Sequence, residues 1–276
     1  ADTSIAAGEF LTLEYMIEGQ DLQRMKKGTS DAEQVTISFY VKGNASATYM
    51  LEVKDGDNDR LNHNQFAVTT SWNRISIPIA GDTTGALNDD NGKSLELRFW
   101  LHAGSNYTSG TYTANTWAGQ THANRAVGIS SFFDATSRTF FLTGLQMEVG
   151  SSATPFEHKT FGQDLIECQR YYFKFLEGNN KEIGVAWYYS SSHASFMFRY
   201  PTTMRATPTG TDETGTGYYT LYANGGSDAF NSVTFENGST ESYSALNNSE
   251  VSGTAGQAGI VRGTNASAKI EFDAEL

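Results

Sequence analysis

The chain has 276 residues, of which 38% are hydrophobic and 18% are charged; this composition excludes a disordered chain and suits one large β domain or two ordinary domains. Its formal net charge of −12 argues against binding to nucleic acids or insertion into anionic membranes, which repel an acidic surface. The one cysteine, Cys168, excludes an intrachain disulfide, and no apolar run approaches the ~20 residues of a membrane span. No signal peptide is visible, and because the chain starts with Ala1 we expect its natural start to lie upstream.

Apolar residues at alternate positions predict a series of β-strands in the first half of the chain. The residues expected to face the core are Val35, Ile37, Phe39, Val41, Tyr49, Leu51, Val53, Ile75, Ile77, Ile79, Leu95, Leu97, Phe99 and Leu101. Pro78 cannot donate a hydrogen bond to a neighbouring strand, which predicts an edge strand or a bulge. Turns rich in Gly, Asp and Asn separate the strands, so we expect an antiparallel sandwich.

The stretch "FFLTGLQMEVGSSATPFEH" (Phe140–His158) reads as the strand that closes this domain. The pattern places Leu145, Met147 and Val149 inward, with Gln146 and Glu148 outward. Pro155 ends further strand pairing, and Phe156 is expected to pack back onto the sandwich. We therefore expect a first domain over residues 1–158, in which upstream strands are missing or the architecture differs.

A helical connector is expected over residues 159–175. Leu165, Cys168 and Tyr172 have the spacing of one helix face, and Cys168 is interpreted as a buried, packed thiol, with a reactive thiol as the alternative. Residues 176–276 then return to strand periodicity and predict a second, small β-sandwich domain. The residues expected in its core are Ile183, Val185, Trp187, Tyr189, Phe196, Phe198, Tyr200, Ile270, Phe272, Ala274 and Leu276.

Catalytic and cofactor motifs are missing from the sequence, so no cofactor is expected. The five histidines are far apart and none has the local spacing of metal ligands. Asp55, Asp57 and Asp59 have the alternate spacing of a calcium loop, but Arg60 replaces the required glycine and Phe66 the final glutamate. A solvated hairpin turn is the preferred interpretation, and a looser calcium site remains the alternative.

Aromatic residues outside the expected core are the best candidates for ligand binding. They are Trp100, Tyr107, Tyr112 and Trp117 in the first domain and Tyr188 in the second. Exposed rings stack on sugars, and Asn, Asp and Ser side chains can bind the hydroxyl groups. The alternative is that these rings cover a second packing layer or a subunit interface.

Several segments together resemble a domain that recurs in tail-fibre-like proteins of bacteriophages and prophages. The matching segments are "IEGQDLQRMKKGTSDAEQVTISFYVKG", "LHAGSNYTSG" with "NTWAGQTHANRAVG", "FLTGLQMEVGSSATPFEHKTFGQDLIECQRYY", and "FRYPTTMRATPT" through "IEFDAEL". The resemblance implies a jelly-roll-like, carbohydrate-module-like sandwich, a short helix and a second β domain, commonly assembled as a homotrimer. It supplies no catalytic residue, and more sandwich sequence usually precedes the first segment.

The resemblance leads us to expect a non-enzymatic virion structural protein, made in the bacterial cytoplasm and incorporated in a phage tail fibre or similar appendage. Its expected partners are two further copies of the chain, other virion proteins and a glycan on the host surface. The alternative is a carbohydrate-binding module or a fragment of a polysaccharide-degrading enzyme. Release of reducing ends from a polysaccharide would distinguish the enzyme from the binding protein.

Overall fold

The computed structural model describes residues 4–276 and confirms an all-β protein. The chain divides into two compact units, residues 1–158 and Lys159–Glu275. The α-helices in the described part of the chain are α1 (Ser105–Thr108) and α2 (Phe161–Gln169), and neither is long and apolar enough to cross a membrane. Short 3₁₀ helices are η1 (Gly19–Asp21), η2 (Gln23–Met25), η3 (His122–Asn124) and η4 (Phe132–Asp134).

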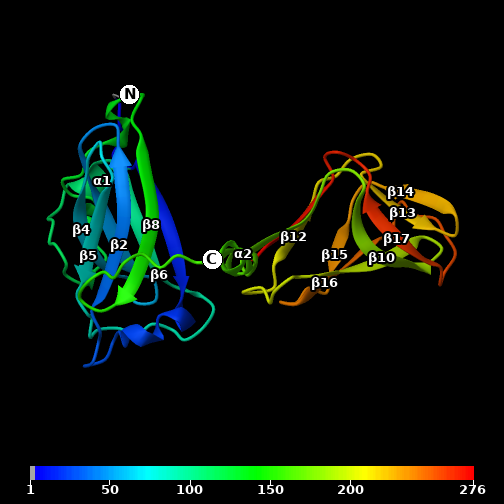
Figure 1. Ribbon diagram of the computed structural model, residues 1–276, viewed down its shortest axis with the longest axis horizontal. Coiled ribbons are helices and arrows are strands. Elements are labelled where there is room, and N and C mark those ends of the chain that lie inside the picture. Colours follow the sequence, from blue (N-terminus) through cyan, green and yellow to red (C-terminus); the bar gives the residue numbers. More distant parts are fainter. Residues whose placement is uncertain (1–3) are drawn as a thin grey trace. The chain divides into compact units, whose positions relative to one another are not determined.

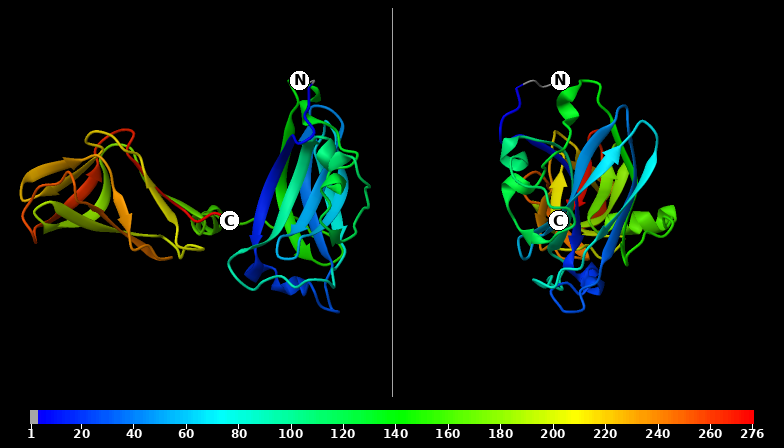
Figure 2. Two further views of the ribbon diagram at one scale, coloured as in Figure 1. Left: turned by 180° about the vertical axis from the view of Figure 1, so that it is seen from behind. Right: turned by 90° about the vertical axis from the view of Figure 1, so that its left-hand side faces the viewer.

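The first unit is a sandwich of two antiparallel sheets (Figures 1 and 2). In spatial order the larger sheet contains β1 (Phe10–Glu18), β6 (Lys93–Ala103), β3 (Ala47–Asp55), β4 (Arg60–Val68) and β7 (Ala118–Gly119). The smaller sheet contains β5 (Asn73–Ile79), β2 (Val35–Gly43) and β8 (Phe140–Val149). One face of each sheet is apolar, so the two sheets remove these faces from water by packing together.

The alternation in the sequence correctly predicted the core of this sandwich. Phe39 from β2 meets Phe66 and Phe99 from the opposite sheet edge to face, with ring centroids 5.2 and 5.1 Å apart. All the residues expected to face the core belong to this one apolar cluster. Pro78 lies in β5, which is an edge strand as expected, so its missing N–H costs no ladder hydrogen bond.

The end of β8 differs in one residue from the expected pattern. Leu145 and Met147 pack against the core, but Val149 is 49% exposed because it is the last residue of an edge strand. The chain then folds back over the outer face of β8, where the Glu148 carboxylate accepts a hydrogen bond from the Thr154 N–H at 3.1 Å. Phe156 approaches Gly144, which has a φ of +60° and packs against the Tyr40 ring so closely that a Cβ would lie 3.0 Å from it.

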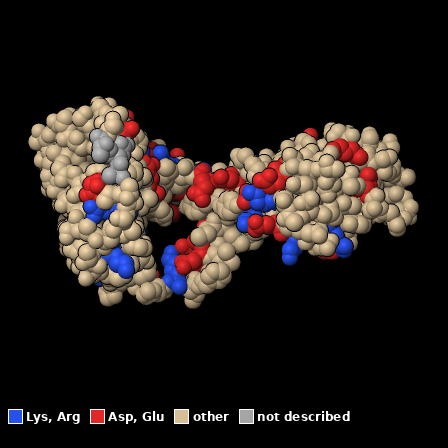
Figure 3. Space-filling view, turned by 90° about the horizontal axis from the view of Figure 1, so that it is seen from above, with Lys and Arg blue, Asp and Glu red and all other residues tan. Residues whose placement is uncertain are grey.

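The second unit is also a sandwich of antiparallel sheets. Its larger sheet contains, in order, β14 (Gly226–Phe230), β13 (Tyr219–Ala223), β17 (Ala258–Gly263), β10 (Lys181–Ser190), β11 (His193–Arg199), β16 (Ser242–Asn247) and β15 (Thr234–Glu236). Its smaller sheet contains β12 (Thr209–Asp212), β18 (Lys269–Asp273) and β9 (Tyr172–Glu177). The C-terminal strand β18 is tied into a sheet, as the alternation at the end of the chain predicted, and is the central strand there. It ends at Asp273, so the expectation that Leu276 lies in the core of this unit is wrong: Leu276 is only partly buried and does not belong to that core. Figure 3 shows that uncharged residues make up most of the visible surface of each unit.

Strand β10 contradicts the predicted inward and outward pattern. Ile183 is buried as expected, but Val185, Trp187 and Tyr189 are exposed, whereas Tyr188 is buried. The cause is a β-bulge between Glu182 and Gly184, where Gly184 adopts a φ of +146°. The extra residue shifts the alternation by one position, so every later side chain points to the opposite face.

Helix α2 exists as predicted, but its apolar stripe is not buried. Thr160 and Gln163 form a capping box that starts the helix, a signal that the sequence contained. Cys168 is exposed and Leu165 is 41% exposed, so the interpretation of Cys168 as a buried thiol was wrong. The helix ends at Gln169, and Tyr172 already belongs to β9, so the three residues do not form one continuous helix face.

Candidate functional site

Trp100 is buried, with 1% of its surface exposed, so the expectation that it stacks on a ligand is wrong. It lies on the outer face of β6, as predicted, but the segment 104–130 covers that face. Met50, Trp100 and Ala126 form a small second core there, with Tyr107 and Tyr112 packed against it. The alternative of a second packing layer therefore holds for Trp100.

A buried ion pair attaches this covering segment to the sheet. The Arg125 guanidinium donates two hydrogen bonds to the Glu52 carboxylate, at 2.9 and 2.5 Å, and both side chains are almost fully buried. The guanidinium also lies 4.8 Å from the centre of the Trp100 ring, a cation–π distance. The next residue, Ala126, donates its N–H to the carbonyl of Tyr107 at 2.9 Å, so this pair also positions Tyr107.

Tyr107 lines a polar surface pocket of about 590 Å³, together with Ser105, Asn106, Ser109 and His122. The Tyr107 ring is half-buried and packs at an angle against other rings. Its centroid lies 5.2 Å from that of Trp100 and 5.4 Å from that of Phe10, which is itself 50% exposed. His122, from η3, approaches Tyr107 edge to face at 6.3 Å. One side of the pocket is therefore formed by the Tyr107 ring, which packs on the buried indole of Trp100.

Several polar side chains of this pocket are available to a ligand. The side chains of Ser105, Asn106, Tyr107 and Ser109 form no hydrogen bond with other residues of the described part of the chain. Two hydroxyls, a phenol and an amide thus provide donors and acceptors beside exposed ring carbons. A sugar presents the same combination, because its C–H groups form apolar patches between hydroxyl groups.

Tyr112 and Trp117 have structural partners instead. The Tyr112 hydroxyl accepts a hydrogen bond from the Gln65 N–H at 3.0 Å. The Trp117 indole donates to the carbonyl of Ala80 at 2.7 Å, and its ring packs against the main core. Both rings therefore help to hold the 104–130 segment on the sandwich, and of the four aromatic candidates in this unit, only Tyr107 contributes to the pocket.

Asp55, Asp57 and Asp59 do not form a calcium site. No group of three or more His, Cys, Asp or Glu side chains suited to a metal occurs within residues 4–276. The Asp57 carboxylate accepts hydrogen bonds from the N–H and side-chain amide of Asn88, both at 3.0 Å. Asp55 is fully buried, and its carboxylate contacts the Lys27 ammonium at 2.5 Å.

The Lys27 ammonium occupies a buried cage of oxygen atoms. Besides Asp55, it contacts a carboxylate oxygen of Asp82 at 3.1 Å and the carbonyls of Thr84 and Gly85, each at 2.9 Å. Only 1% of the Lys27 side chain is exposed. A lysine therefore supplies the positive charge at the place where the sequence suggested a metal ion.

The buried carboxylates of the first unit predict a loss of stability in acid. Burial raises the pKa of Asp82, but hydrogen bonds from Arg60, Thr84 and Lys27 outweigh it and hold the pKa below its ordinary 3.8. Burial likewise raises the pKa of Glu96, but the nearby positive charges of Lys93 and Arg98 outweigh this effect and lower the pKa below its ordinary 4.5. A carboxyl group whose pKa is lower in the folded than in the unfolded state stabilises the fold. This stabilisation is complete at a pH above the unfolded-state pKa, and it is lost as the pH falls through the folded-state pKa.

We therefore expect the melting temperature of the first unit to fall as the pH decreases from about 5 to about 3. Tryptophan fluorescence measures this melting, because three of the four tryptophans, Trp72, Trp100 and Trp117, lie in the first unit. Asp82→Asn should make the melting temperature of the first unit depend less on pH. A melting temperature that stays constant over this range would show that the carboxylates are not preferentially ionised in the folded unit.

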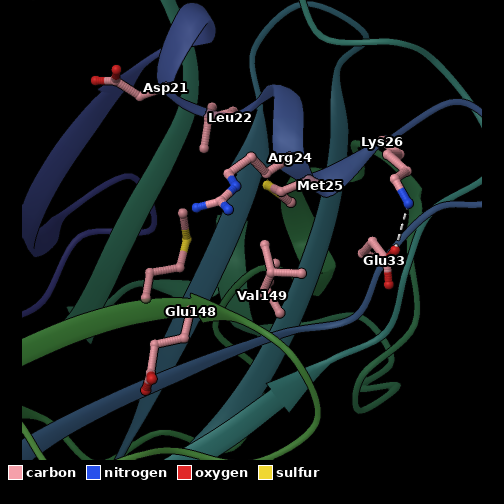
Figure 4. Close-up of a pocket in the computed structure, with 10 residues that line it drawn as sticks. Asp21, Leu22, Arg24, Met25, Lys26, Glu33, Glu148 and Val149 are labelled. Carbon is pink, nitrogen blue, oxygen red and sulfur yellow. Dashed lines mark hydrogen bonds and ion pairs between the residues drawn. The ribbon is translucent and has the colours of Figure 1, made fainter.

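A second pocket of the first unit, of about 710 Å³, lies beside the end of β8 (Figure 4). Figure 4 shows Arg24 extending across it, above Val149, and the ion pair between Lys26 and Glu33, whose atoms are 2.8 Å apart. None of the residues that line this pocket is aromatic. It therefore lacks the ring surface on which a sugar could stack.

The fifth aromatic candidate, Tyr188, is 4% exposed, and its hydroxyl donates a hydrogen bond to Asp228 at 2.9 Å. Burial, together with Asp228, raises the pKa of Tyr188 to about 12, so it stays protonated and serves the core of the second unit. The expectation that it binds a ligand is wrong, because the bulge at Gly184 turns it inward. The same shift exposes Trp187 and Tyr189 instead.

The pocket around Tyr107 contains Asn106 and His122, which the sequence did not single out for ligand binding, and Phe10 packs against the Tyr107 ring beside it. Phe10 begins a strand 97 positions before Tyr107, and only the pairing of β1 with β6 brings it close. The polar, turn-rich composition of residues 104–124 was the one available signal for Asn106 and His122. Comparison of the chain with protein-family models and with curated proteins finds no match.

Proposed function

We propose that this protein is a non-enzymatic virion structural protein, part of a phage tail fibre or similar appendage, that binds a glycan on the host surface. In this proposal the chain assembles as a homotrimer with other virion proteins around it. The resemblance described above supports the virion assignment. The pocket around Tyr107 supports the glycan, because it combines aromatic surface with four polar side chains, those of Ser105, Asn106, Tyr107 and Ser109, that form no hydrogen bond within residues 4–276.

The composition of the pocket favours binding over cleavage. Most glycoside hydrolases use two carboxylates on either side of the scissile bond. The lining consists of Ser105, Asn106, Tyr107, Ser109 and His122, and contains no carboxylate. A carbohydrate-binding module or a piece of a polysaccharide-degrading enzyme is the second candidate. Incubation with capsular or cell-wall polysaccharide tests it, since release of reducing ends would require an enzyme.

Replacing Tyr107 by alanine is expected to weaken glycan binding by about 1–3 kcal/mol, a magnitude taken from the stacking of bases on aromatic side chains. A glycan array identifies the ligand, and calorimetry with that ligand measures the change. Asn106→Ala should weaken binding as well, since it removes the only side-chain amide of the pocket.

Trp72→Ala is the matched control, because Trp72 is 47% exposed and lies on the same unit outside the pocket. Its removal should leave the affinity unchanged. Equal binding by the wild type and by both pocket variants would remove the pocket from the proposed function. Lost affinity in Trp72→Ala alone would move the site to that part of the surface.

A further inference from the structure

The outer face of the larger sheet in the second unit carries an unusual concentration of exposed apolar side chains. We name it the apolar sheet face; its exposed members are Val185, Trp187, Tyr189, Met197, Tyr222 and Ile260. Val185 and Tyr189 are the most exposed, at 66% and 72%. These side chains point away from the core, in which their neighbours Ala186 and Tyr188 are buried.

The members of this face form one continuous surface across four adjacent strands. The register pairs Val185 of β10 with Ile260 of β17, and Ile260 with Tyr222 of β13. Directly paired residues on one face of a sheet have Cβ atoms about 4.5–5.5 Å apart, so these three side chains are neighbours. Trp187 and Tyr189 continue the row along β10, and Met197 lies on the adjoining strand β11.

The face is large enough to form an interface between copies of the chain. Large aromatic side chains bury 150–250 Å² each, so members exposed by 39–72% leave on the order of 500–600 Å² uncovered. This equals the upper end, roughly 300–600 Å², for the largest apolar patch of a typical monomer. Two such faces in contact would bury about 1,000 Å² or more, which is the lower bound for a specific interface.

The chemistry of the face selects the occupant. Unlike the pocket around Tyr107, this face surrounds its aromatic rings with the apolar side chains of Val185, Met197 and Ile260, which have no strong hydrogen-bonding group for a sugar hydroxyl. The charged groups beside them balance, since Arg262 pairs with Glu182 at 3.0 Å and also lies 5.3 Å from the centre of the Tyr222 ring. In a chain of net charge −12, copies repel one another except where they meet through neutral surface. An apolar centre beside an ion pair is the usual anatomy of a protein interface.

We infer that the apolar sheet face is the surface through which copies of this chain associate. Around the threefold axis of a homotrimer, the face of each copy would pack against its two neighbours. The inference gives the homo-oligomer in the proposed function a specific surface. It does not depend on glycan binding in the first unit.

The test is the mass of the full chain in solution, measured by light scattering or analytical ultracentrifugation. We expect the wild type to give a multiple of 30.1 kDa, and Val185→Glu to give the mass of one chain. Tyr189→Ser should also weaken the association and so lower the measured mass. Leu13→Glu is the matched control, because Leu13 is 44% exposed on the first unit, and it should leave the mass of the assembly unchanged.

Each other result would overturn the inference in a recognisable way. A monomeric wild type would remove both this interface and the homotrimer, while glycan binding at Tyr107 could still be measured. An oligomer that persists in both Val185→Glu and Tyr189→Ser, with circular dichroism showing folded variants, would place the contact elsewhere. A monomer that loses glycan binding on Val185→Glu would assign the face to a ligand instead.

Discussion

Replacing Lys27 by alanine is expected to lower the free energy of unfolding of the first unit by about 3–5 kcal/mol, the usual cost of leaving buried partner charges uncompensated. The ammonium neutralises Asp55 and Asp82, and its removal leaves both carboxylates facing two backbone carbonyls. Oxygen ligands of this kind are those that Ca²⁺ prefers. We therefore also expect millimolar Ca²⁺ to restore part of the stability of Lys27→Ala and to leave the wild type unchanged.

Denaturant unfolding followed by tryptophan fluorescence measures both effects. Lys26→Ala is the control at the neighbouring position, because its ion pair with Glu33 is about half-exposed and, being screened by solvent, should contribute little to stability. If Lys26→Ala and Lys27→Ala lower the free energy of unfolding equally, the buried contacts of Lys27 contribute no more to stability than an exposed ion pair. Magnesium serves as the ion control, since its demand for short, octahedral coordination makes it a poor substitute in a cage shaped around an ammonium.

Arg125→Met is expected to cost a similar amount, about 3–5 kcal/mol, because it leaves the Glu52 carboxylate buried without its partner. It should also weaken glycan binding, since Arg125 fixes the segment that carries Tyr107. Calorimetry with the glycan and denaturant unfolding measure the two effects separately.

The double variant Glu52→Met/Arg125→Met separates the charge from the packing. Replacement of a buried ion pair by apolar side chains is often close to neutral, so we expect the double variant to be more stable than Arg125→Met. If the glycan affinity remains low while the stability returns, the ion pair positions Tyr107. If Arg125→Met is as stable as the wild type, the 104–130 segment is held by its other contacts.

The strands of the first unit were predictable because apolar residues recur at every second position, as from Val35 to Val41 and from Leu95 to Leu101. That their other face is buried as well, as Thr36 and Glu96 are, was not predictable from this pattern. The same argument failed on β10. One extra residue at Gly184 reverses all later positions, and neither Val185 nor Tyr188 carries a sign of the reversal in its own identity.

The candidate site was only partly predictable. Tyr107 and Trp100 were both singled out as aromatic residues outside the expected core, Tyr107 in a polar loop and Trp100 on the outer face of a strand, but Trp100 is buried. The two residues differ because the 104–130 segment covers Trp100, whereas Tyr107 belongs to that segment and its ring stays partly exposed. The local sequence indicates which residues have a ring that could stack on a ligand. Whether another segment covers that ring depends on contacts between residues far apart in the chain, such as Arg125 with Glu52.

The amino-acid sequence by itself determined the all-β class, the antiparallel strands and most of the core of the first sandwich. These features follow from patterns repeated over short distances, where turn residues and alternating apolar side chains act locally. Only the tertiary structure decided that a lysine fills the aspartate cage, that an indole supports the pocket, and that Trp187 and Tyr189 face outward. Each of these depends on one long-range contact or one inserted residue, and the free energy that selects it comes from packing between segments rather than from local preference.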